Sequence, residues 1–129
     1  MPKTAVVSPD APQGAGPYSP ALRVGDFVFV SGQASLDPVT HEILGETIEE
    51  QTRNTLHCVK ALLEAAGATL DDVVKVTTFL AHAEDYPRFA EVYKEFFTNE
   101  PLPTCSTVEA AQVWDHLIKL ECMAYVGKT

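Results

Sequence analysis

The sequence predicts an α+β domain in which one β-sheet carries two helices on the same face. This prediction depends on a capped amphipathic stretch at residues 47–66, a second helix start at residues 85–87, and β-branched or aromatic runs elsewhere. The expected element order is βββ-α-β-α-ββ. With 129 residues, 46% of them hydrophobic and 21% charged, the chain is expected to form a single domain over residues 1–129.

The N-terminal third predicts an arm followed by a hairpin. Residues 8–17 are rich in Pro and Gly, which is typical of an irregular surface segment. Residues 21–24 and 27–31 flank a Gly-Asp turn and predict a tight β-hairpin. The second of these strands begins Phe-Val-Phe-Val, an apolar run without alternation, which indicates a strand buried on both faces.

Both helices have recognisable starts. Thr47 and Glu50 fit a capping box, and the first helix is expected to stop at Gly67. Asp85 is expected to cap the second helix, with Pro87 in its first turn. Apolar residues at helical spacing give each helix one face for the core.

The strand expected at residues 73–82 is partly apolar on both faces. One face is expected to carry Val74, Val76, Thr78 and Leu80, and the other Val73, Lys75, Thr77 and Phe79. Two helices cover only one face of the predicted sheet, and the chain has no further element for the other. We therefore expect a second copy of the chain to cover it in a closed homo-oligomer.

Charge and cysteine content exclude several classes of function. The net charge of −9 and pI of about 4.7 leave no basic footprint for nucleic acid. Cys58, Cys105 and Cys122 form no zinc or disulfide pattern, and His82 and His116 stand alone, so no metal is expected. No apolar run is long enough for a membrane span or a signal peptide, so we expect a cytoplasmic or organelle-matrix location.

Two C-terminal stretches are the best candidates for a site. Residues 103–109, Pro-Thr-Cys-Ser-Thr-Val-Glu, gather small hydroxyl and thiol side chains, and residues 118–126 carry Glu121 in a mostly apolar run. Tyr18 lies on a loop between two prolines, where it either lines a pocket or covers the edge of the core. Gly32 either lets a ligand approach the backbone closely or marks a bulge.

Five motifs together resemble those of one family. They are Gly-Pro-Tyr-Ser-Pro-Ala at 16–21, Val-Ser-Gly-Gln at 30–33, Gln-Thr-Arg-Asn at 51–54, Leu-Glu-Ala-Ala-Gly at 63–67, and Tyr93–Phe97 before a Pro-rich turn. The chain resembles the Rid family, also called YjgF/YER057c/UK114 or endoribonuclease L-PSP. The resemblance implies a chorismate-mutase-like (YjgF) fold with one mixed sheet and two helices on one face. It also implies a homotrimer with clefts between its subunits.

The resemblance also implies a chemistry. Archetypal members hydrolyse reactive 2-imino and enamino acids to 2-oxo acids and ammonia without metal or cofactor, a form of metabolite damage control. By similarity to that family, Glu121 and Tyr18 are the expected catalytic residues. The expected substrate-binding residues are Ser31, Gly32, Cys105, Ser106 and Thr107.

The chain departs from the family pattern at the substrate carboxylate. Archetypal members have Arg-Ser-Cys-Val-Glu where residues 105–109 read Cys-Ser-Thr-Val-Glu, so Cys105 replaces the carboxylate-binding arginine and Thr107 the cysteine. Loss of such a desolvated pair typically costs about 2–5 kcal/mol, which is about 30-fold to several thousand-fold in affinity. Ala90 stands where archetypal members have asparagine, and Val-Trp-Asp-His at 113–116 replaces a short turn.

Three functions remain open from the sequence. The first is an imine or enamine deaminase with altered substrate preference, in which Glu121 orients or activates water and Tyr18 donates to the substrate. The alternative is a non-catalytic trimer that binds a small metabolite, in a regulatory role. The third, ribonuclease or translation inhibitor, is disfavoured by the acidic charge. Cys105 is either a reactive thiol or a quiet one, and Trp114 either covers a subunit edge or closes a pocket.

Overall fold

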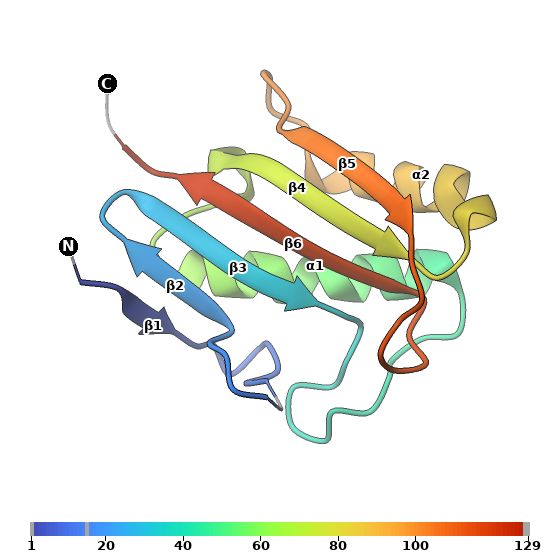
Figure 1. Ribbon diagram of the computed structural model, residues 1–129. Helices are drawn as coiled ribbons and strands as arrows, with labels where there is room; N and C mark the ends of the chain where they lie inside the picture. The colour runs from blue at the N-terminus through green and yellow to red at the C-terminus, as the bar shows by residue number, and fades with distance from the viewer. Residues whose placement is uncertain (1, 15, 128–129) are drawn as a thin grey trace.

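A computed structural model describes residues 2–14 and 16–127. Within them, six strands form one mixed sheet in the order β1-β2-β3-β6-β4-β5, and both α-helices lie on the same face of it (Figure 1). The strands are β1 (Thr4–Val6), β2 (Ala21–Val24), β3 (Phe27–Gln33), β4 (Val73–Leu80), β5 (Thr104–Glu109) and β6 (Ile118–Tyr125). The helices are α1 (Ile48–Ala65) and α2 (Tyr86–Phe96), with short 3-10 turns η1 (Leu70–Asp72) and η2 (Ala83–Asp85). The predicted α+β class and element order are confirmed.

Helix α1 begins and ends as its sequence predicts. The Glu50 amide donates to Thr47 Oγ1 and the Thr47 amide donates to Glu50 Oε1, each over 3.1 Å, which completes the capping box. Gly67 then adopts φ +87°, a conformation that favours glycine and turns the chain out of the helix. The helix therefore presents one fixed face to the sheet.

Three details of the predicted elements differ in the structure. Asp85 occupies the N-cap position of α2 and Pro87 lies in its first turn, as predicted, but the Asp85 side chain makes no capping hydrogen bond; its carboxylate accepts one from Arg88 Nη2 over 2.6 Å. In β4 the pairing with β6 shifts register between Val73 and Lys75, so that Val73 is buried at 4% exposure and Val74 is 42% exposed. A bulge reverses the expected alternation at the start of a strand. The strand also ends at Leu80 and not at residue 82.

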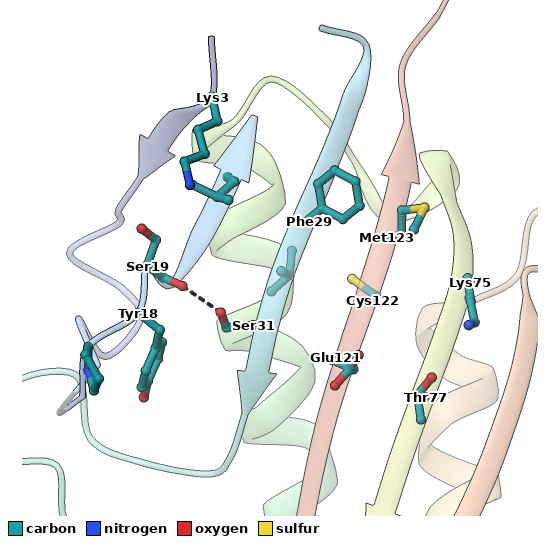
Figure 2. A pocket seen from close by; sticks show the side chains of 13 residues that line it. Lys3, Tyr18, Ser19, Phe29, Ser31, Lys75, Thr77, Glu121, Cys122 and Met123 are labelled. Carbon is teal, nitrogen blue, oxygen red and sulfur yellow. Dashed lines mark hydrogen bonds between the residues drawn. The ribbon is translucent and has the colours of Figure 1, made fainter. Parts of the chain in front are cut away.

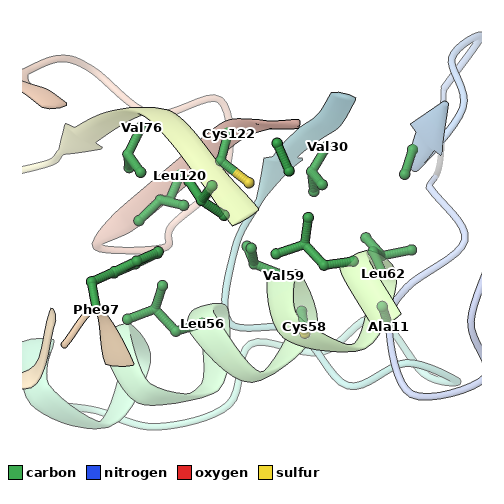
Figure 3. Packing of buried hydrophobic residues seen from close by; sticks show 14 of the residues in the cluster. Ala11, Val30, Leu56, Cys58, Val59, Leu62, Val76, Phe97, Leu120 and Cys122 are labelled. Carbon is green, nitrogen blue, oxygen red and sulfur yellow. The ribbon is translucent and has the colours of Figure 1, made fainter. Parts of the chain in front are cut away.

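The hydrophobic core lies between α1 and the sheet (Figure 3). Leu56, Val59 and Leu62 of α1 pack in one cluster with Val30 of β3 and Leu120 of β6. None of the described helices has the length and apolar character to cross a bilayer. The core thus accounts for one face of the sheet only.

The opposite face of the sheet, called the open face below, carries aromatic side chains. Phe27, Phe29 and Tyr125 are 42%, 39% and 44% exposed, and the Phe27 ring centroid lies 5.1 Å from that of Tyr125. The strand at residues 27–31 was predicted to be buried on both faces. Within a single chain this holds for one face, where Val28 and Val30 point into the core. Burial of the other face by a second copy stays a prediction.

Candidate functional site

The first cavity lies on the open face between the N-terminal arm and strands β3, β6 and β4, and has a volume of about 520 Å³ (Figure 2). The residues that line it include Lys3, Tyr18, Ser31, Lys75, Thr77 and Glu121. Three of the seven expected site residues, Tyr18, Ser31 and Glu121, therefore face one space.

Hydrogen bonds and two glycines place Tyr18 at this cavity. Ser31 Oγ donates to the Ser19 carbonyl over 2.6 Å, and the Ser31 amide donates to the Pro20 carbonyl over 2.9 Å, which ties the arm to β3. A Cβ at Gly14 or Gly16 would come within 3.0 or 2.9 Å of the Tyr18 ring, so both glycines make room for it. The Ser31 hydroxyl thus positions the catalytic candidate.

Glu121 projects from β6 onto the open face, where it pairs across the ladder with Thr77 of β4. It is exposed, and no ion pair within 4.0 Å engages it among residues 2–14 and 16–127. Figure 2 shows its carboxylate on β6 and the Tyr18 ring on the arm, on either side of Ser31 in β3. A carboxylate and a phenol at one cavity can accept and donate protons.

The neighbouring thiol has no such role. Burial raises the pKa of Cys122 to about 12, and the negative charge of Glu121 adds to this effect. Because the thiolate is the nucleophilic form, Cys122 stays an inert core residue at neutral pH.

A second cavity of about 420 Å³ adjoins the first, and Tyr18 lines both. It contains Gly32, which lies in a register shift of the β3–β6 ladder between Val30 and Gln33. A side chain at Gly32 would collide with Lys119 Cε. The bulge interpretation of Gly32 is confirmed, and the close contact observed there is with the Lys119 side chain; ligand contact stays a prediction.

His116 is part of this second cavity, although no role was predicted for it. It is 4% exposed, and its Nδ1 has no hydrogen-bond partner. Burial lowers the pKa of His116, the Lys119 charge lowers it further, and the nearby Ile118 backbone opposes the shift in part. The only sequence signal for His116 was its position in the stretch that replaces the short turn of the archetypal family.

Gln51 fixes the two loops that line the second cavity. Its Oε1 accepts from the Leu117 amide over 2.8 Å, and its Nε2 donates to the Gly45 carbonyl over 3.1 Å. The first bond holds the loop that carries Trp114 and His116, and the second holds the loop that ends near Ile43. Trp114 lines the cavity and remains exposed, which agrees with the pocket interpretation of this residue.

The three candidates on β5 do not join the others within one chain. Cys105 pairs with Val76 and Thr107 with Thr78, and both partners are buried toward the helices. Since paired residues point to the same face, Cys105 and Thr107 face the helices, opposite to Glu121. Ser106 pairs with Thr77 on the open face, two strands away from Glu121.

Cys105 itself is exposed at the edge of the sheet. Tyr93 of α2 lies near it, and burial raises the pKa of Tyr93, with Cys105 contributing. Among the described residues, no group of three His, Cys, Asp or Glu side chains is arranged to hold a metal ion.

A family model, Endoribonuclease L-PSP, matches residues 8–126. The chain belongs to the Endoribonuclease L-PSP family. Among its relatives, a RutC family protein of Pyrococcus abyssi is 44% identical over 126 residues, which is 97% of this chain and 98% of the relative. A protein of Dermatophagoides farinae named 2-iminobutanoate/2-iminopropanoate deaminase is 40% identical over 112 residues, 87% of each chain.

Solved structures of L-PSP relatives share the fold. A Thermotoga maritima protein superposes with a TM-score of 0.91 at 41% identity, covering 97% of this chain and 98% of that one. Escherichia coli TdcF with bound serine gives a TM-score of 0.88 at 34% identity, covering 96% and 99%. The family and the single mixed sheet with two helices, inferred from the motifs, are confirmed.

Proposed function

We propose that this L-PSP family chain is an imine or enamine deaminase, which hydrolyses a reactive imino or enamino metabolite to a carbonyl compound and ammonia. The observation that carries this function is the exposure of Glu121 and Tyr18 to one cavity (Figure 2). The deaminase name of the Dermatophagoides farinae relative supports the same reaction class. Cys105, in place of an arginine, supports an altered substrate preference.

The reaction needs a placed water and a group that takes its proton. Water adds to the carbon of the C=N bond while Glu121 accepts one of its protons, and the electron pair of the C=N bond moves to nitrogen. Nitrogen takes up the proton held by Glu121 and then the proton of the new hydroxyl group, so that the C–N bond breaks, ammonia leaves, and the carbonyl forms. The Tyr18 hydroxyl donates a hydrogen bond to the substrate, and Ser31 holds Tyr18 in place through the Ser19 carbonyl.

The assembly that we propose is a homotrimer with clefts between subunits. In it, the β5 edge of one copy supplies Cys105, Ser106 and Thr107 to the cavity of the next, because a single chain keeps them apart. The exposed aromatic side chains of the open face support such an assembly. The proposed role, removal of reactive metabolites, belongs to the cytoplasm or an organelle matrix.

The decisive experiment follows the hydrolysis of freshly generated 2-iminobutyrate. The wild-type chain should accelerate it, Glu121→Gln should reduce kcat by at least about 100-fold, the usual range for a lost general base, and Glu64→Gln on the exposed face of α1 should leave the rate unchanged. Cys105→Arg should raise kcat/KM for this carboxylate-bearing imine. Absence of acceleration by the wild type and by Cys105→Arg would contradict the deaminase.

The second candidate is a trimer that binds a small metabolite without converting it, in a regulatory role. The observation in its favour is the neutral Cys105 at the position of the carboxylate-binding arginine. The bound serine in the TdcF relative shows that a member of this fold holds an amino acid. Under this alternative, saturable metabolite binding would accompany complete absence of hydrolysis.

A further inference from the structure

Lys119 is a cation held at the second cavity. It lies on β6 two residues before Glu121, so both side chains leave the open face about 6.7 Å apart along the strand. Its methylene stem lies across Gly32, where only the absence of a side chain gives it room. The residue is half-buried, and packing of the stem limits the positions that its ammonium group can take.

The Lys119 charge is not used by the chain itself. In the part of the chain that the structure describes, the ion pairs within 4.0 Å involve Arg53, Arg88 and Lys94 as cations, and none involves Lys119. This holds although acidic residues outnumber Lys and Arg by 18 to 9 and Asp115 lines the same cavity. An anion that enters the cavity therefore meets an available ammonium group.

The same cavity contains a buried polar group that lacks a partner. His116 Nδ1 makes no hydrogen bond, and a buried polar atom left in this state typically costs about 1–3 kcal/mol. Trp114 and Ile43 supply apolar walls beside it. The cavity thus combines a cation with an apolar surface, and a small ligand with one anionic group and a short apolar chain matches both.

Two other lysines compete for the same role and fit it less well. Lys3 and Lys75 line the first cavity together with Glu121, and both are exposed. An anion bound to either would occupy the space where water must reach the imine carbon. Lys119 lines the second cavity and Glu121 the first, two residues apart on β6, so a carboxylate at Lys119 can leave the imine carbon bonded to it on the side of Glu121.

We infer that Lys119 is the substrate anchor of this chain: it binds the carboxylate of the imine substrate in the second cavity, in place of the arginine that is absent at position 105. The spacing along β6 then sets the carboxylate at Lys119 and the C=N carbon near Glu121. This role rests on the deaminase function proposed above and makes Lys119 the residue that selects substrates with an anionic group.

The test measures binding of 2-oxobutyrate, the stable product of 2-iminobutyrate hydrolysis, by calorimetry. We expect Lys119→Met to raise Kd by about 30-fold or more, the effect of a lost charge-assisted pair of about 2 kcal/mol. Lys119→Arg should stay within several-fold of the wild type because it keeps the charge. Lys60→Met removes the same charge from the exposed surface of α1 and should leave Kd unchanged. The neutral analogue 2-butanone should bind the wild type and Lys119→Met equally weakly.

The outcomes separate the anchor from the reaction. If the wild type hydrolyses 2-iminobutyrate and Lys119→Met has the same kcat/KM and the same Kd, the anchor is wrong and the deaminase stands. If the wild type binds 2-oxobutyrate in a Lys119-dependent manner without hydrolysing the imine, the anchor stands and the deaminase fails. If 2-oxobutyrate does not bind the wild type at all, the anchor is also wrong.

Discussion

Replacement of Phe27 by lysine tests whether the open face is an interface between copies of the chain. Phe27 lies at the start of β3, next to the Phe29 and Tyr125 rings, and leaves 42% of its surface exposed. Lysine can keep its stem on the neighbouring rings and its charge in water as long as the face is open. In a closed interface the same charge has no water to solvate it.

The size of the effect follows from the exposed area. A phenylalanine offers about 200 Å², so the exposed part of Phe27 is about 80 Å², worth about 2 kcal/mol at about 25 cal/mol per Å². Three copies in a trimer lose about 6 kcal/mol together, which weakens assembly by about four orders of magnitude before the lysine charge is counted. The folded single chain loses little, because this surface is exposed in it.

Sedimentation velocity and light scattering measure the outcome. The wild type should have three times the 14.0 kDa mass of the chain, and Phe27→Lys should shift toward the single-chain mass at micromolar concentration. Val39→Lys is the matched control, since Val39 is 86% exposed on a loop outside the open face. A monomeric wild type, or a Phe27→Lys variant that keeps the full trimer mass, would refute the reasoning from the open face.

Three further predictions concern the residues that support the cavities. Gln51→Leu should lower the free energy of unfolding by about 1–3 kcal/mol, because it leaves the Leu117 amide without an acceptor; urea denaturation measures this, and an unchanged midpoint would contradict it. Ser31→Ala removes the 2.6 Å bond to the Ser19 carbonyl and should cost about 1 kcal/mol of stability. It should also reduce kcat more than KM, because Tyr18 loses its support; a change in KM alone would argue against that role. The pKa of His116 is lowered by burial, so the unfolded state binds a proton more readily than the folded state does. Stability should thus be complete above about pH 6.5 and fall as the pH drops from there toward the lowered folded-state pKa. Thermal melts of His116→Gln between pH 8 and 5 should show less of this loss, and an identical loss would exclude His116 as its source.

Patterns with strictly local causes were predicted well from the sequence. The capping box of Thr47 and Glu50 and the glycine stop at residue 67 depend on neighbours within one turn, and the structure has both. Asp85 reaches the predicted N-cap position, but its side chain pairs with Arg88, one turn further along the same helix, and makes no capping bond. The predicted face of Val74 was wrong because the bulge depends on pairing with the neighbouring strand β6, which the local sequence does not describe.

The structure brings together three of the seven residues that were expected to form the site. Tyr18, Ser31 and Glu121 come together because the arm, β3 and β6 are neighbours in one chain. Residues 105–107 were also identified from a family motif, but β4 lies between their strand, β5, and strand β6. The role of Lys119 escaped prediction because it depends on Gly32, 87 positions earlier, which makes room for the stem across the β3–β6 ladder.

Strand β6 links the stability of the fold to the chemistry of the site. It lies between β3 and β4, and its alternation sends Leu120 and Cys122 into the core while Lys119 and Glu121 face the cavities. A register slip by one residue would bury Lys119 and Glu121 and expose Leu120 and Cys122. The burial of apolar side chains that stabilises the sheet therefore also keeps both charged side chains on the side of the cavities. The loop before β6 has no such constraint. Differences between relatives in substrate preference are therefore expected in that loop, which carries Trp114 and His116, and not in β6 itself.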